Sequence, residues 1–422
     1  MEFQKHQLKN GLRLILAPQE DARAATILVL VEAGSKYETK DKNGISHFLE
    51  HMCFKGTAKR PRPVDIATEL DQVGAAYNAF TGHESTGYYA KADGNHFDML
   101  LDVISDIYLN PTFDPKEIDT ERGVVIEEIN MYEDTPMRKV QELFLALMYG
   151  DQPAGWPLGG DKQILRTLQR EDFVTYRSQH YLANATVVIA AGSLPHDAKE
   201  RIEKAFAGMP QGEKGAKLPV REEQTKPRVL LQHKESDQTH FVLGVRAFSI
   251  FDPRQYVLEV MSAILGGGMS SRLFQKIRGE LGAAYYVRSS ADFFTDTGIF
   301  SSSVGADHNK LELTLRTILE EYARLKQESV SQEELQKAKE YLKGSLVLSM
   351  ETSDELASFY GGQEILTKSI LTPEEIFARI DAVTSEQIQA LAATLFEDRN
   401  LNLALIGPAK ENALFEKILH FA

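Results

Sequence analysis

The segment from His47 to His51 contains the residues of this chain whose types and spacing best suit metal chemistry. His47, Glu50 and His51 are three and four residues apart, so on a helix they project from one face. Two neutral imidazoles on adjacent turns can bind Zn²⁺, and a catalytic site needs one more protein ligand and an open position for water. Glu50 is placed to take a proton from that water. The order of these residues is the inverse of the commoner His-Glu-x-x-His arrangement.

A solvated helix face that carries two histidines by accident is the simpler alternative, because the chain contains 11 histidines. The neighbouring residues Phe48, Leu49 and Met52 are apolar, which indicates that the helix is substantially buried. Two imidazoles and a carboxylate in a buried helix need partners, and a metal ion would supply one.

A third ligand is expected from a second helix. Asp114-Pro115-Lys116-Glu117 has the N-cap, the proline at the first helical position and the acidic third position of a helix start. Downstream, Glu121 and Glu128 are seven residues apart, and residues at this spacing share a face two turns apart. This helix therefore offers two carboxylates to a metal site.

The elements that position these residues are mixed strands and helices, which favours an α+β fold over a regular alternation. A Lys9-Asn10-Gly11 turn predicts a hairpin. The remaining predictions for the first half are strands or hairpins over Phe3–Leu8, Leu12–Leu16, Ala25–Val31 and Ala75–Ala90, and helices over Ile45–Gly56 and Asn95–Leu109.

The chain also repeats itself. Gly74-Ala75-Ala76-Tyr77 recurs 208 residues later as Gly282-Ala283-Ala284-Tyr285, and two further matches lie at offsets of 217 and 215 residues. We therefore predict two homologous α/β-sandwich-type domains joined by the polar stretch Gln211–Lys226. Residues 1–212 form the zinc-bearing domain. Residues 213–422 form a related domain without ligands, because the repeat places Ala338 and Ser345 where the first half has its two carboxylates.

Composition limits the classes of partner. The 47 basic and 61 acidic side chains give a net charge of −14, which argues against nucleic acid or an anionic membrane as partner. The single cysteine, Cys53, excludes an intrachain disulfide. The first residues lack the layout of a signal peptide and no apolar run reaches membrane-spanning length, so a cytoplasmic location is expected.

The motif His47–His51, followed by Glu121-Arg122, the apolar run Val124–Ile126 and then Glu128, resembles the pitrilysin/insulinase metallopeptidase family. It is most similar to the short-chain branch that includes the mitochondrial processing peptidase. The resemblance implies one Zn²⁺ per chain, with Glu128 as the third ligand. It also implies that Glu121 is a second carboxylate that supports the site or assists proton transfer. The alternative for Glu121 is a surface residue paired with Arg122 or a lysine.

The same resemblance implies substrate-binding residues in both halves. Asn78, Ala79 and Phe80 match an edge strand that accepts an extended peptide, although an interior strand has the same pattern. Arg278 and Tyr285 match a pair that binds the carbonyl groups of the substrate. Without the resemblance, they would be interpreted as a surface arginine and a half-buried strand tyrosine.

The expected function is that of a zinc metalloendopeptidase that hydrolyses unfolded peptides inside an enclosed chamber, with Glu50 as general base. By the resemblance, this chain is half of a clamshell, so a homodimer is expected, or a heterodimer with a related chain. The alternative is a non-catalytic core or assembly subunit that resembles the family. Retention of His47, Glu50, His51 and Glu128 favours the enzyme.

Overall fold

The computed structural model describes residues 3–421, which divide into two compact units. The first unit comprises Met1–Ile129, Trp156–Leu218 and Leu348–Leu371. The second comprises Asn130–Gly155, Pro219–Val347 and Thr372–Ala422. Each unit has a mixed sheet with helices on both faces, as the predicted α+β class requires. Within the described residues, no helix has both the length and the apolar character needed to span a bilayer.

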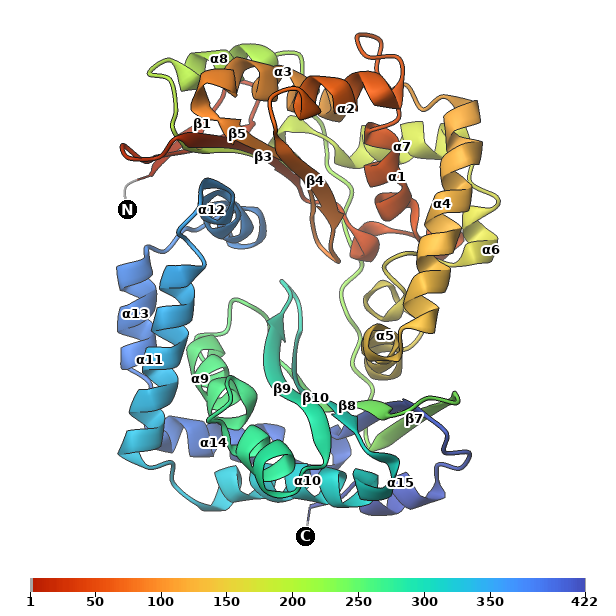
Figure 1. Ribbon diagram of the computed structural model, residues 1–422, viewed down its shortest axis with the longest axis vertical. Helices are drawn as coiled ribbons and strands as arrows, with labels where there is room; N and C mark the ends of the chain where they lie inside the picture. The colour runs from red at the N-terminus through yellow and green to blue at the C-terminus, as the bar shows by residue number, and fades with distance from the viewer. Residues whose placement is uncertain (1–2, 422) are drawn as a thin grey trace. The chain divides into compact units, whose positions relative to one another are not determined.

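The first unit contains a six-stranded sheet in the order β1-β2-β6-β3-β5-β4. Figure 1 shows α3 and α8 on one face of this sheet and α12 on the other. The predicted N-terminal hairpin forms, since β1 pairs antiparallel with β2. The region predicted as a strand or hairpin over Ala75–Ala90 is a hairpin, in which β4 pairs with β5. The strands are β1 (Gln4–Gln7), β2 (Arg13–Pro18), β3 (Ala24–Val31), β4 (Ala76–Thr81), β5 (Thr86–Asp93) and β6 (Thr186–Gly192). The helices are α1 (Ile45–Cys53), α2 (Pro63–Asp71), α3 (Phe97–Leu109), α4 (Pro115–Asp134), α6 (Lys162–Leu165), α7 (Arg170–His180), α8 (Ala198–Ala205) and α12 (Ser353–Thr367).

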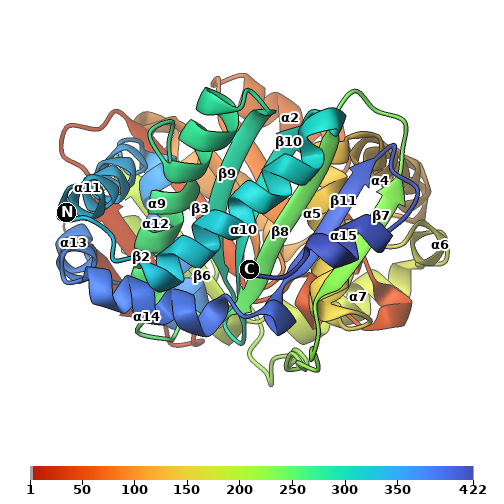
Figure 2. The same ribbon diagram turned by 90° about the horizontal axis from the view of Figure 1, so that it is seen from below.

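The second unit contains a five-stranded sheet in the order β7-β11-β8-β10-β9. In Figure 2, α9, α10 and α14 lie across one face of this sheet, and α5 packs against β8 and β11. The strands are β7 (Arg228–His233), β8 (Thr239–Ala247), β9 (Ala284–Phe293), β10 (Gly298–Ala306) and β11 (Asn402–Gly407). The helices are α5 (Pro136–Tyr149), α9 (Gln255–Gly266), α10 (Leu311–Gln327), α11 (Gln332–Leu348), α13 (Pro373–Asp381), α14 (Ser385–Leu395) and α15 (Ala413–Ile418).

The internal repeat is visible in the order of the strands. In the first sheet β2-β6-β3-β5-β4 follow one another as β7-β11-β8-β10-β9 do in the second. The compact units nevertheless differ in extent from residues 1–212 and 213–422. Helix α5 belongs to the first half of the sequence and packs in the second unit, whereas its repeat counterpart α12 belongs to the second half and packs on β3 and β6 of the first. Each unit therefore takes one helix from the other half of the chain.

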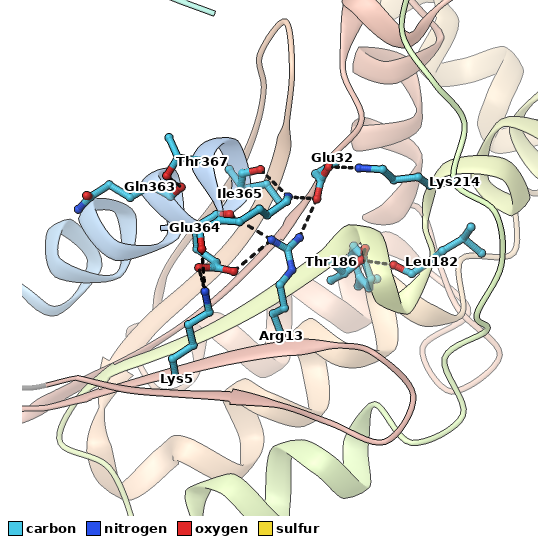
Figure 3. Close-up of polar contacts among 12 residues, drawn as sticks. Lys5, Arg13, Glu32, Leu182, Thr186, Lys214, Gln363, Glu364, Ile365 and Thr367 are labelled. Carbon is cyan, nitrogen blue, oxygen red and sulfur yellow. Dashed lines mark hydrogen bonds and ion pairs between the residues drawn. The ribbon is translucent and has the colours of Figure 1, made fainter. Parts of the chain in front are cut away.

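A buried ionic cluster fixes α12 to the first sheet (Figure 3). The Arg13 guanidinium on β2 donates to Glu32 at 2.8 Å and to Glu364 of α12 at 3.2 Å. Lys5 of β1 pairs with the other oxygen of Glu364 at 2.6 Å. Lys214, from the segment that joins the two halves, pairs with Glu32. One network thus ties β1, β2, α12 and the joining segment together.

We predict that Glu364→Ala lowers the free energy of unfolding of the first unit by about 3 kcal/mol, because it leaves the buried guanidinium of Arg13 without one of its two carboxylates. Fluorescence of Trp156, the single tryptophan, reports urea unfolding of this unit. The control is Asp119→Ala, which removes an exposed partner of Arg122 on α4 in the same unit and should cost about 0.5 kcal/mol or less. Equal effects of the two substitutions would contradict the assigned role of the cluster.

Candidate metal centre

Helix α1 divides its residues between two faces. Ile45, Phe48, Leu49 and Met52 follow the spacing of a helical stripe and are buried in the hydrophobic core of the first unit. Because these residues face the core, His47 and His51, four positions apart on the other face, point together towards α4. The predicted helix therefore forms, and it ends at Cys53.

The start of α1 is held by a buried carboxylate that the sequence analysis did not identify. Glu38 accepts hydrogen bonds from Gly44 N and Ser46 N, both at 2.8 Å, and from Asn43 Nδ2 at 2.9 Å. Two of these donors are backbone N–H groups at the helix start, which need an acceptor. Gly44 has a φ of +97°, a backbone conformation that glycine adopts without strain. No standard capping spacing places an acceptor six residues before Gly44, so no local signal could have revealed Glu38.

A loop that contains Pro157, Gly159 and Gly160 packs against both the start of α1 and helix α4. Asn43 Nδ2 also donates to Pro157 O at 3.1 Å, and Gly44 packs so closely on Gly160 that a Cβ on Gly44 would lie 2.7 Å from its Cα. A Cβ on Gly159 would lie 3.3 Å from the side chain of Ile129 on α4. The backbone of this loop therefore fills the space between the two helices.

Helix α4 begins as predicted, with the Asp114 carboxylate accepting hydrogen bonds from Lys116 N at 2.8 Å and Glu117 N at 3.4 Å. Its buried face contains Glu121. Glu128, two turns later, is partly buried, whereas its neighbour Glu127 is exposed. The two carboxylates that face α1 are therefore Glu121 and Glu128.

Three donor atoms from α1 and α4 converge. His47 Nε2 lies 3.2 Å from His51 Nε2. Glu128 Oε2 lies 3.6 Å from the first nitrogen and 3.5 Å from the second. Within residues 3–421, these residues form the one group of three or more potential ligands whose donor atoms are this close together.

The spacing of the donors fits a tetrahedral ion. Bonds of about 2.0–2.1 Å to tetrahedral Zn²⁺ require ligand atoms about 3.3–3.4 Å apart. The three observed separations, from 3.2 to 3.6 Å, bracket this range. Two imidazole nitrogens and one carboxylate oxygen are also the donor types of catalytic zinc, so His47, His51 and Glu128 fit such an ion.

Glu121 and Lys55 orient the second imidazole. His51 Nδ1 lies 2.8 Å from Glu121 Oε1, and Lys55 Nζ lies 2.6 Å from Glu121 Oε2. The alternative was a surface Glu121 paired with Arg122 or a lysine. Glu121 does pair with a lysine, Lys55, but it is buried and also contacts His51. A carboxylate on Nδ1 fixes the tautomer and leaves Nε2 available as a ligand.

The two histidines differ in their protonation. Burial and the nearby His51 lower the pKa of His47 to about 4, so it is neutral. Burial opposes a charge on His51, but the carboxylates of Glu121 and Glu128 raise its pKa to about 9. A cation at this position is thus favoured by its surroundings, and a metal ion would replace the proton.

Glu50 lies beside the donor group. It is buried, and burial raises its pKa above the usual value. Thr81 Oγ1, at the end of β4, donates to Glu50 Oε2 at 2.6 Å. A buried carboxylate with a raised pKa, next to potential metal ligands, is a suitable proton acceptor.

The predicted peptide-binding residues lie on β4, at the edge of the sheet. Asn78 and Phe80 are exposed, with Phe80 at 43%, while Ala79 is half-buried against the core. A cavity of about 430 Å³ opens on the α12 side of the sheet. Its lining includes Thr26, Leu28, Phe80, Tyr89 and Phe359.

The other predicted pair lies in the second unit. Tyr285 is on β9, the edge strand of that sheet, and is 72% exposed. The Arg278 guanidinium is exposed and stacks over the Tyr285 ring at 5.6 Å from its centroid. The two side chains are therefore neighbours that face solvent in this unit, and their role with a substrate remains a prediction.

Comparisons with known proteins show the family to which the chain is similar. Residues 13–162 match the model of "Insulinase (Peptidase family M16)", and residues 167–342 match that of "Peptidase M16 inactive domain". An uncharacterized zinc protease of Bacillus subtilis is 36% identical over 96% of this chain and 98% of its own. One of Rickettsia felis is 34% identical over the same shares. The crystal structure of a protease from Helicobacter pylori has the same fold, with a TM-score of 0.90 at 22% identity, covering 96% of this chain and 99% of that one.

The Glu38 carboxyl predicts a pH dependence of stability. Burial raises its pKa from 4.5 to about 7, although three donors favour the ionised form. The folded chain therefore binds this proton more tightly than the unfolded chain. The stability of the wild type relative to Glu38→Gln should thus be greatest below about pH 4.5 and fall as the pH rises to about 7. Urea unfolding followed by Trp156 fluorescence at several pH values measures this, and parallel profiles would contradict it.

Proposed function

Because the chain belongs to the insulinase family of peptidases, family M16, we propose that it is a zinc metalloendopeptidase of unfolded peptides, with Glu50 as general base. The observation that carries the proposal is the convergence of three donor atoms from α1 and α4, 3.2–3.6 Å apart, beside a buried glutamate. The proposed ligands are His47 Nε2, His51 Nε2 and Glu128 Oε2.

Zinc bound there would polarise the scissile carbonyl and lower the pKa of a water molecule. The protein contributes the orientation of the ligands. Glu121 holds His51 through Nδ1, and Lys55 holds Glu121, so that a change at either residue would alter the direction of a ligand.

Glu50 accepts the proton of the attacking water and delivers it to the leaving amine. Its raised pKa makes it a stronger base than an exposed carboxylate, and it keeps the proton it accepts until the leaving amine takes that proton. General acid–base catalysis of this kind contributes about 10²- to 10⁴-fold to a rate.

The edge strand β4 supplies the binding mode for the substrate. An extended peptide can pair with the outer edge of β4 along Asn78, Ala79 and Phe80, so recognition uses the backbone. The Ala79 N–H, which donates to Asn78 Oδ1 at 2.9 Å, would exchange that hydrogen bond for one to the peptide. The cavity beside Phe80 is lined by apolar side chains, among them Leu28 and Phe359, and by the acidic Asp354 and Glu355 of α12, and it would take a side chain of such a peptide. A folded protein presents few free extended segments, which supports unfolded peptides as the substrate class.

Arg278 and Tyr285 are proposed to bind carbonyl groups of the substrate. An exposed guanidinium stacked on an exposed phenol offers two donors for a developing oxyanion. One chain thus carries both the proposed metal ligands and this pair, which supports a homodimer as the enclosed chamber, with a heterodimer of related chains as the other arrangement.

We expect the purified chain to form a dimer in solution, because by the family resemblance one chain is half of the chamber. Size-exclusion chromatography with light scattering measures the mass. A mass of 47.2 kDa at all concentrations tested would exclude the homodimer and would leave the heterodimer with a related chain.

We expect Glu50→Gln to lower hydrolysis of a quenched fluorescent peptide by about 10²- to 10⁴-fold, because the amide cannot accept a proton. Zinc content, measured by atomic absorption, should stay near one ion per chain. Removal of zinc by a chelator should abolish hydrolysis in the wild type, and added zinc should restore it.

The controls come from α4. Glu128→Gln should lose zinc and hydrolysis together, because an amide is a weaker zinc ligand than a carboxylate. Glu127→Gln, one residue away and exposed, should retain both. A zinc-free protein on which Glu50→Gln has no effect would instead favour the non-catalytic assembly subunit.

A further inference from the structure

The two oxygens of the Glu50 carboxylate have different surroundings. Oε2 accepts a 2.6 Å hydrogen bond from Thr81 Oγ1. Among the hydrogen bonds formed by residues 3–421, this is the one made by the Glu50 side chain. The carboxylate is therefore oriented through one oxygen, and Oε1 is the oxygen left to accept a proton.

Thr81 connects this orientation to the edge strand. It is the last residue of β4 and pairs with Thr86 across the β4–β5 hairpin. Side chains alternate along a strand, so Phe80 is exposed on the open face, whereas Thr81, like Ala79, points to the face on which α1 packs. A peptide that pairs with β4 would thus fix the strand that carries the Glu50 partner.

We propose that Thr81 is a positioning residue, whose hydroxyl sets the Glu50 carboxylate so that Oε1 faces the attacking water, and which couples peptide pairing on β4 to the orientation of the base. This inference rests on the proposed peptidase function.

A purely structural hydrogen bond is the competing explanation, and kinetics separates the two. Thr81→Val keeps the shape of the side chain and removes the donor, so Glu50 loses its orientation while the backbone of β4 is retained. We expect kcat to fall about 10- to 100-fold, the range for a hydrogen bond to a charged group, with KM within about two-fold of the wild type. Thr81→Ser, which keeps the hydroxyl, should restore most of kcat.

Thr86→Val is the matched control. Thr86 lies directly opposite Thr81, and its hydroxyl donates to Ala33 O at 2.9 Å, away from Glu50. This substitution removes one hydroxyl from the same hairpin, so it should lower stability, measured by urea unfolding, and leave kcat unchanged. If both valine variants lose kcat equally, the effect belongs to the hairpin and the inference is overturned.

Two measurements keep the test independent of folding and of the proposed function. Zinc content should be unchanged in all variants, and Thr81→Ala replaces Thr81→Val if the latter fails to fold by Trp156 fluorescence. A zinc-loaded wild type that hydrolyses no peptide would overturn the proposed function itself. An active wild type with an equally active Thr81→Val would overturn the role of Thr81 alone.

Discussion

The structure of the first unit depends on one constraint: two imidazoles of α1 and a carboxylate of α4 must lie within about one hydrogen-bond length of each other, largely out of water. Polar groups in such a place are costly unless each has a partner. The surrounding structure supplies such partners for His51, whereas Nδ1 of His47 is buried without a hydrogen-bond partner among the described residues. Glu121 Oε1 contacts His51 Nδ1, and Lys55 pairs with the other oxygen of Glu121. The loop that contains Gly159 and Gly160 packs between the two helices and sets the distance between them.

Comparison of the two halves of the repeat separates the features of the fold that they share from the side chains that differ between them. Both sheets have the same strand order and both receive a helix from the other half of the chain. The counterpart of α4 is α11, which presents Ala338 and Ser345 instead of carboxylates. The counterpart of Tyr77, half-buried on β4, is Tyr285, which is 72% exposed on β9. The same architecture therefore presents potential metal ligands in one copy and potential carbonyl-binding groups in the other.

Local patterns in the sequence predicted the structural features that depend on residues close together in the chain. The apolar stripe of α1 predicted a buried helix, and the Asp114 cap predicted the start of α4. What the sequence could not predict depends on contacts between distant residues. The packing of α12 on β3 could not be predicted from periodicity, because the apolar face of a helix does not determine which sheet it packs against. Glu38 and Thr81 were missed for the same reason, because their partners are set by the path of the chain.

The environments of the acidic residues around α1 also separate their roles. Burial opposes ionisation of Glu121, but hydrogen bonds from His51 and Lys55 hold its pKa below the usual value. Burial raises the pKa of Glu50, and its one hydrogen bond, from Thr81, only partly offsets this. When two carboxyls in one site have their pKa values pushed apart, the raised one is suited to exchange protons and the lowered one to act as a fixed charge. Glu50 is therefore suited to act as the base and Glu121 to orient His51.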